Sequence, residues 1–236
     1  MIINPYRFAS AGGFSRIFDG TNDYLTVAND ASLNFGDASN DSAFSITAWV
    51  KPIDNVRVFT LTMGSLASRE YGFGLNASGY LFLQIFDDTS SVNRVITQNT
   101  VIANNVWTHI AATYDGRGGV NAQDGMELYI NGTLQTSPSR GTTGSYTAMH
   151  NQGLAAAIGL SYNDGSNYAD SKIADLRVYS EEVSAANIST IESGGSYTTN
   201  LVSQWIINES LDDQAGTNNA SEGSGSSTTT STDFPL

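Results

Sequence analysis

The chain has 236 residues and no cysteine, which excludes disulfide scaffolds, thiolate zinc sites and cysteine nucleophiles. Its 23 acidic residues outnumber its 10 basic ones, and the net charge of −13 opposes binding to nucleic acid or to an anionic membrane surface. This charge has two interpretations, which are solubility alone or a share of carboxylates that hold calcium. No apolar run is long enough to span a membrane, and the first residues lack the pattern of a signal peptide. We therefore expect synthesis in a cytoplasm and no membrane insertion.

Residues 1–16 have the pattern of an extended N-terminal arm, because Pro5 and the Gly12-Gly13 pair interrupt any periodicity. Isolated aromatic side chains give this arm points of attachment. The arm packs as an edge strand on its own domain, or it docks on a neighbouring subunit. In the second case its anchoring residues are Tyr6, Arg7, Phe8 and Phe14.

From Phe18 onward, short strand patterns alternate with turn signals. Apolar side chains recur with period two in residues 44–50 and again in residues 80–86, as expected for strands. Asn131-Gly132 predicts a tight hairpin, since a type I′ turn needs positive φ at both central residues. With 40% hydrophobic residues and many such short strands, the chain is predicted to form an all-β sandwich or jelly roll.

The last third of the chain changes in character. Ser184 is expected to cap a short helix in which Ile188 and Ile191 recur at helical spacing, and Gly194-Gly195 ends it. Residues 201–207 form one more strand, which contains Trp205. Residues 208–236 are rich in Ser, Thr and Gly and are predicted to be a mostly irregular polar extension.

Five phrases occur in the order typical of one fold: Phe18–Leu25, Phe44–Pro52, Trp107–Gly116, Met126–Gly132 and Lys172–Tyr179. Through them the chain resembles the laminin-G-like, concanavalin A-like jelly-roll superfamily. The resemblance implies a two-sheet antiparallel sandwich over residues 17–207, in a fold used mostly for surface recognition. In many relatives the strand with the Leu-Val-x-x-Trp pattern comes first, whereas here it comes last. It completes the same sheet or begins a truncated repeat, and we favour the former because a lone strand could not bury Trp205.

Calcium is the cofactor that the resemblance implies, because many laminin-G-like domains hold one ion with acidic side chains and backbone carbonyls. Calcium takes six to eight oxygen ligands, which an acidic, Asn-rich chain can supply. The candidate ligands are Asp19 and Asp175. In the alternative interpretation, Asp19 caps a turn and Asp175 accepts hydrogen bonds from backbone amides.

A loop over residues 159–170 combines aromatic rings with amide and carboxylate groups, a mixture that suits carbohydrate hydroxyls or a protein–protein patch. Its candidate ligand-binding residues are Tyr162, Asn163, Asp164, Asn167, Tyr168 and Asp170. Tyr71 and Tyr146 are further candidates because they are expected in loops. The three tryptophans could also stack on sugars, but their positions within strand motifs favour the core.

Catalysis is not favoured by the sequence. Some jelly rolls of the superfamily are glucanases, and retaining glycosidases need two carboxylates about 5 Å apart. Glu70 and Glu127 are in strand-like segments, but neither has an acidic partner two or four positions away. His109 occupies a position where the family phrase commonly carries histidine, so we interpret it as structural. We predict that the protein is not an enzyme.

Three functional classes remain. The Asn4–Phe8 opening and the Trp strand followed by a polar stretch ending Asp233–Pro235 resemble bacteriophage virion proteins that carry laminin-G-like domains. This predicts a capsid decoration protein or fibre-like adhesin on the virion exterior, with other virion proteins, its own copies and host-surface glycans as partners. The alternatives are a carbohydrate-binding module of a bacterial surface protein and, less favoured, a glucanase-like hydrolase.

Overall fold

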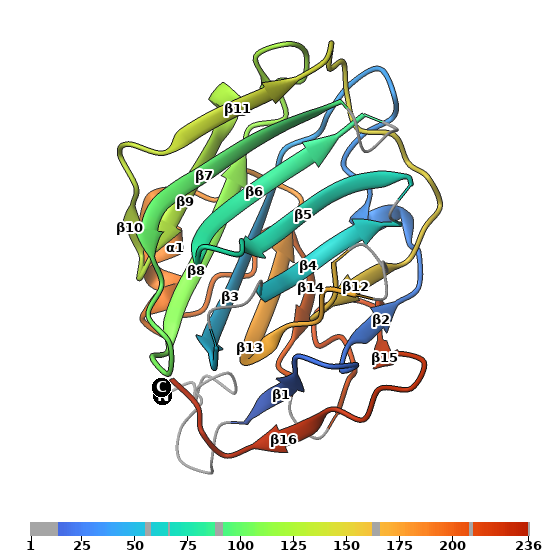
Figure 1. The fold of residues 1–236 in the computed structure, drawn as a ribbon. Helices are drawn as coiled ribbons and strands as arrows, with labels where there is room; N and C mark the ends of the chain where they lie inside the picture. Colours follow the sequence, from blue (N-terminus) through green and yellow to red (C-terminus); the bar gives the residue numbers. More distant parts are fainter. Residues whose placement is uncertain are drawn as a thin grey trace.

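The computed structural model describes residues 14–54, 58–65, 67–87, 92–161, 166–207 and 210–235. Within these residues the chain forms two antiparallel sheets packed face to face, with one α-helix (Figure 1). This confirms the predicted all-β jelly-roll sandwich with one short helix. Six predicted site residues lie outside the described residues, namely Tyr6, Arg7, Phe8, Tyr162, Asn163 and Asp164.

Each sheet has eight strands in the described part of the chain. Sheet A contains, in spatial order, β10 (Thr133–Leu134), β9 (Met126–Ile130), β8 (Thr108–Tyr114), β3 (Phe44–Pro52), β13 (Asp170–Tyr179), β1 (Ser15–Asp19) and β16 (Thr229–Ser231), with β14 (Leu201–Trp205) also paired to β13. Sheet B contains β11 (Ser139–Thr143), β7 (Asn93–Val101), β6 (Tyr80–Phe86), β5 (Arg69–Leu75), β4 (Val58–Gly64), β12 (Ala156–Ile158), β2 (Leu25–Val27) and β15 (Ala220–Glu222). Two 3-10 helices, η1 (Ala31–Leu33) and η2 (Ala122–Gly125), lie in connections.

The main core fills the space between the sheets. Phe44, Ile46 and Val50 of β3 are fully buried there, as are Leu83 and Ile85 of β6. Their alternation along the strands is the period-two pattern read from the sequence, because successive side chains of a strand point to opposite faces. Residues at the intervening positions of β3 and β8 are buried as well, so the outer face of sheet A is also covered.

Helix α1 (Ala185–Glu192) provides part of that cover. The Ser184 side chain accepts a hydrogen bond from the backbone N–H of Asn187, and this cap begins the helix. Ile188 and Ile191 are buried in a second apolar cluster that includes Tyr129 and Tyr179 of sheet A. The cap and the buried pair confirm the predicted helix. Among the described residues, no helix has both the length and the apolar character needed to cross a membrane.

Local turn chemistry also agrees with the sequence. Asn131 (φ 47°) and Gly132 (φ 69°) both have positive φ and join β9 to β10, with Ile130 paired to Thr133. This is the predicted type I′ hairpin. At the N-terminal side, Phe14 is half-buried directly before β1. The last two residues of the predicted arm, Ser15 and Arg16, already belong to β1 of sheet A.

The C-terminal part of the chain completes both sheets. Strand β14 pairs with β13, and Trp205 is 1% exposed with its indole N–H donating to the carbonyl of Asn218 (2.7 Å), so the tryptophan strand completes the sandwich as predicted. The described residues after 207 are mostly irregular, as predicted, but they include two short strands that the sequence did not indicate. Strand β15 extends sheet B beside β2, and β16 extends sheet A beside β1. Residues after 207 thus add an edge strand to each sheet.

Candidate ligand-binding rim

One end of strand β13 meets the turn between β1 and β2. Asp19, the last residue of β1, pairs with Asp170, the first residue of β13, and the Gly20 N–H donates to the carbonyl of Ala169 (2.9 Å). Gly20 has φ 72°, and a Cβ there would lie 2.9 Å from Cβ of Asp170, so a glycine suits this close approach. The pairing brings residues 19–24 against residues 166–170.

Tyr24 and Tyr168 form the aromatic part of this contact. Their ring centroids are 6.0 Å apart with an interplanar angle of 49°, and both residues are half-buried. Tyr168 is fixed by an antiparallel bridge to Leu160, which is itself buried. Asn167 precedes Tyr168 and is also half-buried. We call the set Asp19, Tyr24, Asn167, Tyr168 and Asp170 the tyrosine rim.

The rim carboxylates differ in their surroundings. Asp19 is exposed, and its Oδ1 accepts from the backbone N–H groups of Thr21 (2.8 Å), Asn22 (3.1 Å) and Asp23 (3.2 Å). Partial desolvation opposes ionisation there, but the backbone donors outweigh it and lower the pKa of Asp19. Desolvation raises the pKa of Asp170, and the negative charges of Asp54 and Asp19 raise it further. The rim is therefore a region of negative potential.

Asp175 lies elsewhere, in the interior of β13. It has φ 46° at a bulge and is 4% exposed. Arg177 donates to its two oxygens from Nε (2.9 Å) and Nη2 (2.6 Å), and Gln204 Nε2 donates to Oδ1 (2.7 Å). It lies five residue steps along the strand from Asp170, which corresponds to about 16 Å.

Asp19 and Asp175 therefore do not lie together in one site, and the calcium ion stays a prediction. Asp19 caps its turn, as in the alternative interpretation, and both oxygens of Asp175 are used by side chains within the protein. The described residues also contain no group of three or more His, Cys, Asp or Glu side chains arranged to hold a metal. Of the predicted metal and ligand residues, Asp19, Asn167, Tyr168 and Asp170 come together at the rim, and Asp175 does not.

Two tyrosines that we expected in loops are buried. Tyr71 lies on β5 with 0% exposure, and its hydroxyl donates to the carbonyl of Leu33 (3.1 Å). Tyr146 is 2% exposed and donates to Asp41 Oδ2 (2.8 Å). Neither ring can stack on a ligand. Trp49 and Trp205 are buried as expected, and Trp107 is half-buried with its indole N–H donating to Asp233 (2.9 Å).

The groups considered for catalysis are dispersed. Glu70 is on β5 of sheet B and Glu127 is on β9 of sheet A, so they do not form a carboxylate pair. Burial raises the pKa of Glu70 to about 7, and its only described donor is the backbone N–H of Gln152 (2.8 Å). His109 is 1% exposed against Trp49, and burial lowers its pKa to about 4. These contacts agree with the structural interpretation of His109.

Tyr24 was not singled out from the sequence. It lies within the phrase Phe18–Leu25, which we interpreted only as a fold motif. Its position in the sequence could have indicated this role. Tyr24 lies between a Gly-Thr-Asn-Asp turn and the buried strand β2, where a large side chain is placed at the edge of the sandwich. Its partner Tyr168 is 144 residues away in sequence, so their proximity required the tertiary structure.

Several solved structures share this fold. A putative carbohydrate binding protein from Bacteroides ovatus has a TM-score of 0.62 at 16% identity, covering 94% of this chain and 60% of that one. A heptameric SAP-like pentraxin from Limulus polyphemus has a TM-score of 0.56 at 16% identity, covering 89% and 94%. The binding domain of botulinum neurotoxin serotype G has a TM-score of 0.51 at 14% identity, covering 79% and 47%. At these identities the likeness is one of fold.

The chain thus spans 60% of the Bacteroides protein and 47% of the toxin domain. No curated protein matches the chain in sequence. The sequence profile of the Laminin_G_3 family, described as the concanavalin A-like lectin/glucanases superfamily, matches residues 19–189, which is more than half of the chain. The protein belongs to the Laminin_G_3 family.

Proposed function

We propose that this protein is a non-enzymatic recognition protein that binds carbohydrate at the tyrosine rim. The observation that carries the proposal is the pair of half-buried rings, Tyr24 and Tyr168, beside the side chains of Asn167 and Asp170. Aromatic rings offer apolar faces to the C–H groups of a sugar, and amide and carboxylate groups hydrogen-bond its hydroxyls. The lectin-type fold and the separation of Glu70 from Glu127 on different sheets support binding without hydrolysis.

The charge of the rim narrows the class of glycan. The negative charges of Asp54 and Asp19 lie close enough to raise the pKa of Asp170, and neither Asp19 nor Asp170 belongs to an ion pair among the described residues. Like charges disfavour the approach of an anionic ligand. The proposed ligands are neutral glycans, or glycans with free amino groups, rather than sialylated or phosphorylated ones.

The finer part of the proposal concerns location. The protein is proposed to be on the exterior of a bacteriophage particle, as a capsid decoration protein or a fibre-like adhesin. The resemblance of Asn4–Phe8 and of the C-terminal residues to phage virion proteins supports it. The arm residues Tyr6, Arg7, Phe8 and Phe14 would anchor it to other virion proteins or to its own copies. Many copies on one particle would multiply a weak affinity for host glycans.

The alternative is a carbohydrate-binding module of a bacterial surface protein. Its support is the similarity of fold to the putative carbohydrate binding protein from Bacteroides ovatus, of which this chain spans 60%. Both alternatives use the same rim, so glycan binding is tested independently of location.

The binding test uses a glycan array followed by calorimetric titration of the best neutral ligand. Tyr168→Ala is expected to raise Kd about tenfold, because a central aromatic contact contributes roughly 1–2 kcal/mol. Tyr80→Ala is the matched control, since Tyr80 is also half-buried but starts β6, four strands away from β2 in sheet B. Titrations in calcium and in EDTA test the predicted cofactor in the same experiment. Absence of wild-type binding to every glycan contradicts the proposal.

Location is tested by antibody labelling of the source phage lysate and reconstruction of the particles by cryo-electron microscopy. Density for this domain at repeated positions on the head makes it a decoration protein, and label confined to the tail tip makes it an adhesin. Particles without label contradict the virion proposal and leave the bacterial module in its place.

A further inference from the structure

The C-terminal residues cross the open edge between the two sheets. Residues 220–233, which we call the strap, begin in β15 beside β2 of sheet B and end just after β16 beside β1 of sheet A (Figure 1). Because β1 and β2 flank the turn that carries Asp19 and Tyr24, the strap runs alongside that turn. The tyrosine rim therefore lies next to a segment that the sequence suggested was an irregular extension.

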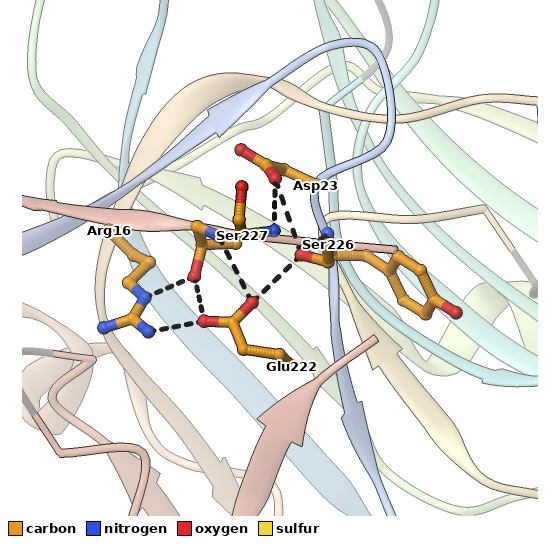
Figure 2. Close-up of polar contacts among 7 residues, drawn as sticks. Arg16, Asp23, Glu222, Ser226 and Ser227 are labelled. Atoms are coloured by element: carbon orange, nitrogen blue, oxygen red, sulfur yellow. Dashed lines mark hydrogen bonds and ion pairs between the residues drawn. The ribbon is translucent and has the colours of Figure 1, made fainter. Parts of the chain in front are cut away.

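A polar network fastens the strap to this turn. Glu222 accepts hydrogen bonds from Arg16 Nη2 (2.6 Å), Thr228 Oγ1 (2.6 Å) and Ser226 Oγ (2.9 Å). Arg16 is 7% exposed, so Glu222 is paired with a cation set into sheet A. Asp23 Oδ1 accepts from the backbone N–H of Ser227 (3.0 Å). Figure 2 shows Arg16, Asp23, Glu222, Ser226 and Ser227 converging in this network.

The strap forms hydrogen bonds with all three polar groups of Tyr24. The Tyr24 N–H donates to Ser226 Oγ (3.0 Å), its carbonyl accepts from the Gly223 N–H (2.9 Å), and its hydroxyl accepts from the Ser224 N–H (3.0 Å). The ring itself lies on the backbone of Gly223. A Cβ at residue 223 would be 2.1 Å from Cζ of Tyr24, a distance that forces the ring or the strap to move.

We propose that the strap is a positioning element of the binding rim, and that Gly223 is the residue through which it fixes the ring of Tyr24. This inference rests on the proposed function of the rim. The bare backbone of Gly223 supports the Tyr24 ring, and the hydrogen bond from the Ser224 N–H to the Tyr24 hydroxyl opposes its rotation toward solvent, which keeps it beside Tyr168. The other two hydrogen bonds hold the backbone of Tyr24 in place. A ring fixed before the ligand arrives loses less conformational entropy on binding.

Gly223→Ala tests the inference, with Gly225→Ala as the matched control in the same turn. A Cβ at residue 225 meets nothing within 4 Å, and its cost is backbone strain at φ +78°. Gly223→Ala is expected to raise the Kd for a neutral glycan about tenfold and to shift the Tyr24 ring signals in NMR spectra of tyrosine-labelled protein. Gly225→Ala is expected to lower Tm while changing Kd less than about twofold.

A double-mutant cycle separates positioning from a general structural effect. In a Tyr24→Ala background the side chain that Gly223 supports is gone, so Gly223→Ala should cause no further loss of affinity. Equal losses in both backgrounds, or a Gly223→Ala variant that binds like the wild type, would overturn the inference and leave the proposed function standing. Failure of the wild type to bind any glycan would instead remove the proposed function, and the positioning role with it.

Discussion

Strand β13 carries two carboxylates in opposite situations, one at its first residue and one in its interior. Asp175 is 4% exposed and receives the guanidinium of Arg177 and the amide of Gln204, so its charge is satisfied within the protein. Asp170 is half-buried and faces the carboxylates of Asp19 and Asp54. A charge that is paired inside the fold serves stability. A charge held among like charges at the edge of the sandwich is available to select a ligand.

Removing the cation that pairs with the buried Asp175 should have the largest effect. Arg177→Ala leaves Asp175 as an unpaired buried carboxylate, and we expect the free energy of unfolding to fall by about 3–5 kcal/mol. Arg117→Ala, which breaks the exposed pair with Asp115, is the control and should cost less than about 1 kcal/mol. Urea unfolding measures both. Equal losses would mean that burial does not distinguish the two ion pairs.

Glu70 sharpens the comparison, because it is buried without a cationic partner among the described ion pairs. Its pKa rises from an ordinary 4.5 to about 7, so the folded state binds the proton more tightly. The contribution of Glu70 to the free energy of unfolding is therefore complete below pH 4.5, and it is lost as the pH rises through 7. Glu70→Gln keeps the acceptor for Gln152 and removes the charge.

At pH 8 we expect Glu70→Gln to be more stable than the wild type by on the order of 2–3 kcal/mol, with little difference at pH 4.5. Urea unfolding across this range checks it. Glu192→Gln, at the half-buried end of α1, is the control variant. A constant difference between Glu70→Gln and the wild type at all pH values would contradict the assignment.

The strap provides a smaller, pH-dependent effect. Lys172, Lys51 and the indole of Trp107 donate to Asp233 and hold its pKa well below the ordinary 3.8. Its stabilisation is present above pH 3.8 and is lost as the pH falls below that value. Because these groups are partly exposed, Asp233→Asn should cost at most about 1 kcal/mol, or 2–4 °C in Tm, at pH 7. Thermal melts of both proteins at pH 7 and at pH 2 measure this. If Asp233→Asn lowers Tm by the same amount at both pH values, the prediction is refuted.

The rim should respond least in stability and most in selectivity. Asp170→Asn removes one of the repelling charges, and we expect the free energy of unfolding to change by less than about 0.5 kcal/mol. The ratio of affinities for neutral and anionic glycans should fall severalfold, because the like-charge barrier is reduced. Paired titrations with a neutral glycan and its sialylated form measure this ratio. An unchanged ratio would show that the rim carboxylates do not select by charge.

Part of the candidate site was accessible from the sequence. Asn167, Tyr168 and Asp170 were predicted as ligand residues because ring, amide and carboxylate groups are concentrated in one loop, and all three lie at the rim. Tyr71 and Tyr146 were wrong as candidates because their burial depends on the opposite sheet and on Asp41. Asp19 was paired with the wrong residue of β13, since the register between β1 and β13 joins it to Asp170.

The sequence by itself determined the elements whose signals are local. Strands β3 and β6 follow from alternating apolar residues, the β9–β10 hairpin follows from Asn131-Gly132, and α1 follows from its Ser184 cap. Only the tertiary structure decided the tyrosine pair and the strap. Strands β15 and β16 are polar edge strands that are mostly exposed, so no hydrophobic period marks them. They exist because backbone groups of β1 and β2 need partners and because Glu222 meets Arg16, 206 residues earlier in the chain.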